Sequence, residues 1–544
     1  MRDAIFSSSN EINDAIILKI KDLNKIIENL IDESEILEEY YQIWKKVGNR
    51  ISDKDYTSSK QQVKKKNPTE QKLKRIFSTE IVIALIVRSL AAIKIFDINS
   101  DNFNGIEIIN KYFNDLKKSK SNFLFQDDFY NIWAINFLKG DMEQIDQFIG
   151  TLLPEILKLL RKQSPKQIFL TIHQNILDLD LRKILGEIYT PPEISKLISH
   201  WVYHYLESKD SVIDLSCGVG ILLSDFIEKC KKMEAYSQIK KVIGIDINPL
   251  STLICKFILI YDDLENLQNN KISEPLVFCA DSLISYANLR NSRNKIEFKI
   301  EFIGDNYDIA VDFVGKDLIG LRKILSDEIN KNLNKEPSKI RLPDRLKTIL
   351  KSNLLKKYFK SLLIERICAV FALNSKYDAV LGNPPYLRVQ SIQPLWRREI
   401  LKQKYQSAFG HFDIYYLFIE LGINLLSEIG ILGYVSSNKF MSTTAGSRIR
   451  DYISKNTTIK NLIDFNDSHI FEARVLPAIY ILSRKKRVEN FLLTSMKKIK
   501  SEEFKKIDTD DFLNYMTNTK EIDGIYKINS KPPIILDRFQ PNQP

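Results

Sequence analysis

The first 185 residues carry apolar side chains at helical spacing. A strongly apolar segment follows at 78–96, and helical patterns recur near 105–117 and 142–162. The pattern predicts an all-helical N-terminal domain over residues 1–185, packed either as a bundle or as a short coiled coil. In the first predicted helix, one apolar face is formed by Ile16, Ile20, Leu23, Ile27 and Leu30.

From residue 186 the pattern changes to short apolar runs separated by helical segments. Strands that alternate with helices predict βαβ units and a parallel sheet. We therefore expect an α/β fold with a Rossmann-like sheet over residues 186–485. Residues 284–374 are charged and show few strand signals, which indicates a helical insertion between two strands of that sheet. The predicted strands are Val212–Asp214, Val242–Asp246, Leu276–Phe278, Tyr377–Leu381 and Gly430–Val435.

The surplus of basic residues is unevenly distributed along the chain. The 544 residues carry a net charge of +11, and the sequence pI is near 9.0. Segments 60–75 and 484–500 each contain seven basic residues and one acidic residue. Two such blocks suit a polyanionic partner, although solvated helix faces produce the same pattern. Residues 486–544 are predicted to form a short basic C-terminal segment.

Cysteine and histidine usage argues against a metal centre. The five cysteines form no CxxC pair, and His200 and His204 lie four positions apart without a third ligand. We therefore expect no metal site, no disulfide framework and a cytoplasmic location. The most apolar stretch, 81–96, contains two basic residues and is shorter than a bilayer span, so no membrane association is expected.

Three consecutive strand ends carry residues suited to a single small molecule. After the first strand, Asp214 is followed by Gly218 and Gly220, which let the backbone approach a ligand closely. Asp246 ends the second strand and can hold a ribose diol, and Asp281 follows the third and can accept from an adenine amino group. An aspartate at any one of these positions, taken alone, is more often a helix cap or a turn residue. The ordered set predicts a pocket for adenosine with an amino-acid tail, S-adenosyl-L-methionine.

A stiff polar turn follows the predicted strand at 377–381. Its residues are Asn383, Pro384, Pro385 and Tyr386, placed where open α/β sheets bind their ligands. The two prolines fix φ and remove two N–H donors, so the turn is rich in carbonyl acceptors. An amide oxygen beside such carbonyls suits an exocyclic amino group. Taken alone, the same four residues are ordinary turn sequence.

Taken together, these residues resemble the N6-adenine DNA methyltransferases, in particular the methyltransferase portion of type IIG restriction–modification enzymes. The resemblance covers roughly residues 186–485 and includes the segments 413–420 and 430–440. It implies catalysis by Asn383, Pro384, Pro385 and Tyr386, with Phe471 stacking on the target base. It implies cofactor binding by Tyr189, Thr190, Asp214, Gly218, Gly220, Asp246 and Asp281.

The resemblance implies site-specific transfer of a methyl group from S-adenosyl-L-methionine to N6 of adenine in double-stranded DNA, within a restriction–modification or related defence system. The target base would be extruded from the duplex. Two alternatives stay open: a methyltransferase for protein glutamine or RNA, and a non-catalytic DNA-binding or scaffold subunit with a methyltransferase fold.

The sequence also shapes our expectation about partners. Residues 486–544 resemble only the start of a target-recognition region, and no convincing nuclease arrangement of the PD…ExK type is found. We therefore expect either a specificity or nuclease partner subunit, or a truncated chain.

Overall fold

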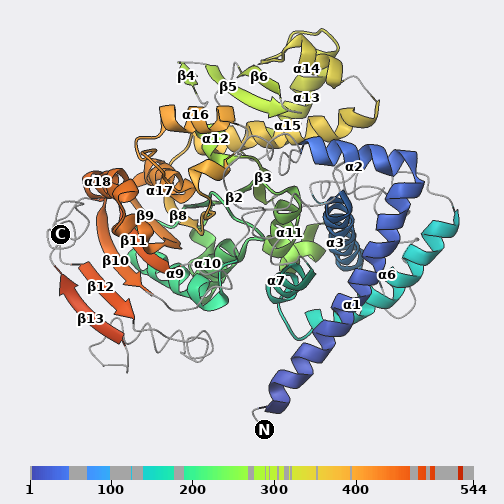
Figure 1. Cartoon of the computed structure of the whole chain (residues 1–544), viewed down its shortest axis with the longest axis horizontal. Helices are drawn as coiled ribbons and strands as arrows, with labels where there is room; N and C mark the ends of the chain where they lie inside the picture. The colour runs from blue at the N-terminus through green and yellow to red at the C-terminus, as the bar shows by residue number, and fades with distance from the viewer. Residues whose placement is uncertain are drawn as a thin grey trace, which may run out of the picture. The chain divides into compact units, whose positions relative to one another are not determined.

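The computed structural model divides the chain into two compact units (Figure 1). The first, called here the helical unit, comprises residues 1–185, 249–275 and 291–365, and the second, the sheet unit, comprises 186–248, 276–290 and 366–544. The division into functional domains stays a prediction. The structure describes residues 3–47, 70–98, 124, 139–176, 189–267, 275–287, 290–292, 295–302, 305–311, 318, 321–350, 353–392, 395–465, 476–485, 491–496 and 525–530.

Long helices form the first part of the helical unit, as predicted. The five residues of the predicted apolar face, Ile16, Ile20, Leu23, Ile27 and Leu30, are all buried. That helix packs against four others, so its apolar stripe faces the interior of the unit. The helices are α1 (Asp3–Glu33), α2 (Glu35–Val47), α3 (Glu70–Phe96), α6 (Lys139–Leu160) and α7 (Pro165–Ile176).

Helix α3 forms the core of the helical unit. It has 27 residues, and by length and composition alone it could cross a membrane. Its most apolar window is entirely buried inside the structure, against α1, α6 and α11 (Pro249–Ile260) among others. The expectation that this stretch is too short for a bilayer was wrong, because the helix begins at Glu70 rather than at residue 78. Burial, not length, identifies α3 as a core helix.

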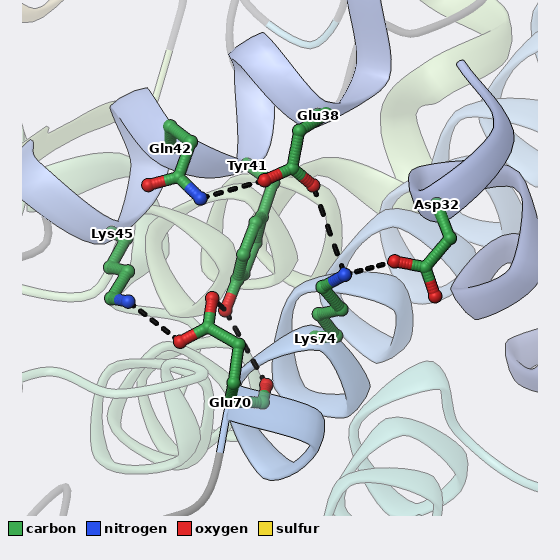
Figure 2. A network of polar contacts seen from close by, with 7 residues as sticks. All are labelled: Asp32, Glu38, Tyr41, Gln42, Lys45, Glu70 and Lys74. Atoms are coloured by element: carbon green, nitrogen blue, oxygen red, sulfur yellow. Dashed lines mark hydrogen bonds and ion pairs between the residues drawn. The ribbon is translucent and has the colours of Figure 1, made fainter. Parts of the chain in front are cut away.

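Polar side chains attach the start of α3 to α1 and α2 (Figure 2). The carboxylate of Glu70 accepts hydrogen bonds from Tyr41 Oη and Lys45 Nζ, both at 2.7 Å. Lys74 forms an ion pair with Asp32. Lys74 belongs to the basic block 60–75, of which residues 60–69 lie outside the described part. At least one charge of that block therefore stabilises helix packing.

The insertion predicted to be helical contains a small sheet. Helices occupy its second half, but β4 to β7 form a four-stranded sheet in the order β4-β5-β6-β7. The prediction was wrong for 290–311, because the alternation of charged and apolar residues in 295–302 is the period of a strand with one face in water. The elements are β4 (Arg290–Ser292), β5 (Lys295–Phe302), β6 (Asp305–Val311), α13 (Leu321–Leu333), β7 (Ile340–Arg341), α14 (Asp344–Ile349) and α15 (Asn353–Leu373).

The sheet unit contains a nine-stranded mixed sheet in the order β13-β12-β10-β11-β9-β8-β1-β2-β3. All five predicted strands are present, and the predicted α/β fold with a Rossmann-like sheet is confirmed. The predicted strands are β1 (Ser211–Asp214), β2 (Lys241–Asp246), β3 (Leu276–Cys279), β8 (Tyr377–Gly382) and β9 (Leu426–Ser437). The others are β10 (Thr458–Asp464), β11 (Pro477–Ser483), β12 (Phe491–Met496) and β13 (Ile525–Ser530).

Strand β1 lies at the point where the order of the sheet reverses. It pairs in parallel with β2 on one side and with β8 on the other. Asp214, the last residue of β1, is level with Gly244 and Leu381. In open α/β sheets, ligands bind outside the carboxyl ends of the strands at such a reversal. The predicted cofactor and catalytic residues therefore lie around one edge of the sheet.

Helices cover both faces of this part of the sheet. On one face, a Cβ added at Gly433 would lie 2.3 Å from Val202 of α9. The next residue of β9, Tyr434, points to the other face, and its side chain lies under Gly422 of α17. Helix α10 packs beside α9, and α18 packs beside α17 (Figure 1). The bounds are α9 (Pro192–Tyr205), α10 (Ile221–Lys232), α12 (Ser282–Ala287), α16 (Leu395–Lys404), α17 (Ile414–Leu425) and α18 (Ser447–Asn456).

The close approach of α9 to β9 makes Gly433 a sensitive position. We expect Gly433→Ala to lower the free energy of unfolding by about 1–3 kcal/mol, because the added methyl group overpacks the interface. Urea unfolding followed by circular dichroism measures the change. Gly150→Ala is the matched control. It lies within α6 with open space around it, so it should stabilise the protein by roughly 0.5–1 kcal/mol. Equal stability of Gly433→Ala and wild type would contradict this packing.

Candidate active site

The glycine loop after β1 has the backbone shape that its glycines predict. Gly218 and Gly220 adopt positive φ angles of +51° and +88°, which residues with a Cβ rarely adopt. The Gly218 N–H donates to Asp246 Oδ2 at 2.8 Å. A Cβ built at Gly218 would meet no atom within 4 Å, so open space lies beside the loop. The loop therefore offers room for a ligand against bare backbone.

Asp246 links the ends of β1 and β2. Besides Gly218, its carboxylate accepts the Asn248 N–H at 2.8 Å. Each carboxylate oxygen can accept a further bond, so the half-buried side chain can also bind hydroxyl groups. The next residue, Ile247, is 53% exposed at the same edge of the sheet. Sequence analysis missed Ile247, although an apolar residue directly after a strand-end acid could have signalled a ligand surface.

Asp214 is an acid held in a nearly water-free position. Its side chain is buried, and its Oδ1 accepts the Ser216 N–H at 3.0 Å. Burial raises the pKa of Asp214 to about 8, and the nearby Asp246 carboxylate also raises it, whereas the Ser216 hydrogen bond lowers it. The carboxyl group is therefore largely protonated at neutral pH. A cationic ligand group placed beside it would favour the ionised form.

Asp281 follows β3 and begins the short helix α12. Its Oδ1 accepts the Ile284 N–H at 3.0 Å, the capping role that remained an alternative from sequence. Its Oδ2 forms an ion pair with Arg397 of α16. Both side chains are partly buried. Arg397 was not predicted, although it belongs to a group of basic residues that follows the tetrapeptide closely.

The Asn383 amide is held from both ends. Its Nδ2 donates to Thr190 Oγ1 at 3.1 Å, and its Oδ1 accepts from the Tyr386 hydroxyl at 2.9 Å. The Asn383 carbonyl also accepts from Ser216 Oγ of the glycine loop at 3.4 Å. Both partners are hydroxyl groups, which can donate or accept, so the two bonds together fix the plane of the Asn383 amide.

Aromatic side chains support the tetrapeptide. The Tyr386 ring lies 6.1 Å from that of Tyr415, which in turn lies 6.4 Å from Phe440. The Phe440 N–H donates to the Tyr415 hydroxyl at 3.1 Å. Burial raises the pKa of Tyr386 well above its ordinary value, so its hydroxyl stays protonated and can serve as the donor to Asn383. Taken as a whole residue, Tyr386 is half-buried, with its hydroxyl group inside.

The structure brings most of the predicted site residues to one edge of the sheet. Tyr189 is partly exposed beside the buried Thr190, at the start of α9. Pro384 is buried and Pro385 partly exposed. Phe471 lies outside the described residues. Hydrogen bonds join these residues in two groups. One consists of Thr190, Asn383 and Tyr386, and the other of Gly218 and Asp246.

Comparisons with known proteins match this same region. Residues 179–291 match the family model for N-6 DNA methylases, and residues 240–471 match that for the Eco57I restriction-modification methylases. The resemblance to N6-adenine DNA methyltransferases is confirmed. The matched methylase models imply an enzyme that depends on S-adenosyl-L-methionine.

Similarity to individual proteins is limited to part of their length. The chain is 34% identical over 129 residues to the type II restriction enzyme and methyltransferase RM.Eco57I of Escherichia coli, covering 23% of this chain and 13% of the relative. It is 35% identical over 115 residues to the type II methyltransferase M.BstVI of Geobacillus stearothermophilus, covering 20% of each. The match thus spans a fifth or less of these relatives.

A similar fold occurs in the DrdV–DNA complex solved by cryo-electron microscopy. The TM-score is 0.52 with 11% identical residues, over 97% of this chain and 46% of that one. At this identity the likeness concerns the fold alone.

The burial of Asp214 predicts a pH dependence of stability. Its pKa is about 8 in the folded chain, against an ordinary value of 3.8. Between these values the folded state binds a proton that the unfolded state lacks, so stability falls as pH rises from 3.8 to about 8. We expect Asp214→Asn to flatten this part of the profile, measured by urea unfolding at a series of pH values. If the free energy of unfolding of the variant depends on pH as steeply as that of wild type, Asp214 does not have a raised pKa in the folded chain.

Proposed function

We propose that this protein transfers a methyl group from S-adenosyl-L-methionine to N6 of adenine in double-stranded DNA, as the modifying component of a restriction–modification or related defence system. One observation carries the proposal: the Asn383 amide is held by Thr190 and Tyr386 beside the glycine loop. This arrangement lies in the region that matches the methylase models. In this arrangement the Asn383 amide can accept a hydrogen bond from a substrate amine next to the cofactor.

The residues at the sheet edge fit S-adenosyl-L-methionine. The open space at Gly218 would admit the cofactor against the backbone, and the half-buried Asp246 would accept from its ribose. The buried Asp214 would ionise beside the ammonium of the amino-acid end, which Tyr189 and Thr190 would also contact. Asp281 would lie toward the adenine. When bound, the cofactor supplies an electrophilic methyl group on a positively charged sulfur.

The tetrapeptide would increase the nucleophilicity of the adenine amine. Because Asn383 Nδ2 donates to Thr190, its Oδ1 points to the opposite side as an acceptor. Tyr386 occupies one lone pair of this oxygen, and the other can accept one N6 hydrogen. The Pro384 carbonyl would accept the second hydrogen. When both hydrogens are drawn out of the ring plane, the N6 lone pair is no longer delocalised into the aromatic ring and can attack the methyl group. Because the acceptors are already fixed, they need no reorganisation during the reaction.

The base must leave the duplex to reach these acceptors. Extrusion costs a few kcal/mol of stacking and pairing. The half-buried Tyr386, whose ring lies edge-to-face with that of Tyr415, would stack on the extruded adenine. Such stacking contributes about 1–3 kcal/mol per base. Phe471 would complete the clamp from the other face, as its place in the sequence motif suggests.

Recognition of a particular DNA sequence is assigned to parts beyond the catalytic region. The matched segments cover a fifth or less of the curated relatives. We propose that a specificity or nuclease partner subunit, or a target-recognition region beyond the matched segments, completes recognition. A cytoplasmic location agrees with a DNA substrate.

Replacing the catalytic amide separates chemistry from cofactor binding. We expect Asn383→Ala to reduce methyl transfer by roughly 100-fold or more, because the N6 hydrogens lose an aligned acceptor, while affinity for S-adenosyl-L-methionine stays near that of wild type. Asp246→Ala should show the opposite pattern, with weak cofactor binding. Transfer of label to unmethylated genomic DNA measures the first quantity and calorimetry the second. Full activity of Asn383→Ala would exclude the proposed role.

Thr190 should act on the rate through the orientation of Asn383. Thr190→Val keeps the shape but removes the acceptor for Asn383 Nδ2. We expect kcat at saturating cofactor to fall about tenfold, the equivalent of one net hydrogen bond. Thr190→Ser, which keeps the hydroxyl, should retain most of the activity. If both variants show the same kcat, the hydroxyl does not position the amide.

A further inference from the structure

A third basic segment follows the tetrapeptide directly. Residues 386–411 contain five basic residues and one acidic residue, a net charge of +4. Unlike the blocks at 60–75 and 484–500, this segment is described by the structure except for residues 393 and 394. Its basic residues are Arg388, Arg397, Arg398, Lys402 and Lys404.

Side chains from this segment form a continuous surface with the loop at 405–413 and the start of α18. Arg398 donates to the Gln390 carbonyl at 3.2 Å, and Gln390 Nε2 lies 2.5 Å from His411 Nδ1. The Arg448 guanidinium of α18 lies 4.3 Å from the ring centre of Phe409, which belongs to the same loop as His411. All are exposed or partly exposed. We call the surface formed by Arg388, Gln390, Arg398, Phe409, His411 and Arg448 the basic ledge.

The loop that carries Phe409 and His411 is firmly anchored. The buried carboxylate of Glu420 accepts the Gln406 and Ser407 N–H groups at 3.0 and 2.7 Å. Gly410, between Phe409 and His411, is exposed with a φ of +60° and open space around it. The ledge is therefore preorganised, which lowers the entropy cost of binding a partner.

The ledge begins at the rim of the proposed catalytic site. Leu387, the residue after Tyr386, accepts the Ile414 N–H at 2.8 Å, and Val389 donates to the Phe412 carbonyl at 3.0 Å. These two bonds fix the ledge to the tetrapeptide through a short piece of antiparallel backbone. Asp413 adjoins this rim, is partly buried and lies close to both Lys439 and Arg388.

We propose that the basic ledge binds the phosphodiester backbone of the DNA strand that carries the target adenine, with Phe409 stacking on a base next to the extruded one. The proposal rests on the proposed adenine methylation. Guanidinium groups pair with phosphate oxygens through two hydrogen bonds, and amide and imidazole groups add further donors. Extrusion leaves neighbouring bases without a stacking partner, and an exposed aromatic ring held by Arg448 can replace it.

An acidic protein partner would satisfy the charge of the ledge but would not use the exposed ring beside a base-modifying site. Double-stranded DNA uses both features, which favours it as the occupant. RNA binding is an outcome that the following experiment can reveal.

The test uses the full chain, S-adenosyl-L-methionine and fluorescent short duplexes. One duplex is fully paired, and the other has a central adenine opposite an abasic site, which lowers the cost of extrusion. Arg398→Ala combined with Arg448→Ala should weaken binding about tenfold and reduce the slope of log affinity against log salt by about 1–2. Phe409→Ala should reduce the preference for the abasic duplex about tenfold, since stacking acts there.

The matched control is Lys232→Ala combined with Lys240→Ala. Both side chains are exposed, and Lys240 precedes β2, at the edge of the sheet opposite the site. This pair also removes two positive charges but should leave affinity and salt slope unchanged. Cofactor affinity measured by calorimetry should be equal in all variants.

Several outcomes would overturn the proposal. An unchanged salt slope in the Arg398→Ala and Arg448→Ala variant, an equal loss in the control, or tighter binding of an RNA duplex of the same sequence would each do so. If the wild-type protein methylates DNA adenine while the ledge variants bind as it does, only the ledge assignment fails. If wild type transfers no methyl group to DNA, the proposed function itself fails.

Discussion

The parallel pairing of β1 with both β2 and β8 is the constraint on which the proposed site depends. It places Asp214, Asp246 and the turn after Gly382 around one edge, although Asp214 and Asn383 are 169 positions apart along the chain. Ser216 then joins the glycine loop to the Asn383 carbonyl, and Asp246 joins the same loop to β2. A shift of β8 by one residue would reverse the side-chain directions along that strand and misplace the tetrapeptide.

The electrostatics of this edge are set by burial as much as by charge. Asp214 lies beside Asp246 in a place with little water, so the protein by itself favours the protonated acid. A ligand with a positive end would therefore be bound together with the loss of a proton. The same edge also carries basic side chains, Arg397 inside and Arg398 and Arg448 outside. This separation of acids in the pocket from bases on the rim suits a cationic cofactor and a polyanionic substrate.

Errors in the sequence-based predictions have specific physical causes. Strand β5 was missed because its charged residues were taken as a sign of exposed helix. Their alternation with Ile and Phe is the two-residue period of a strand, which turns apolar side chains such as the buried Phe298 to one face of the small sheet. The length of α3 was underestimated because its first eight residues are more polar, and they are fixed by Tyr41 and Lys45 from α2. A partner distant in sequence fixes the start of α3, whereas β5 pairs with β6, the next strand along the chain.

By itself, the sequence determined the five central strands, the order of the glycine loop, acids and tetrapeptide, and the resemblance to N6-adenine methyltransferases, because strand periodicity and turn chemistry are local properties. Only the tertiary structure decided how the Asn383 amide is oriented, that Asp281 is paired with Arg397, and that Phe409 and Arg448 lie on one ledge. These depend on distances between side chains from different elements, which packing of the sheet and its helices sets and no local pattern encodes.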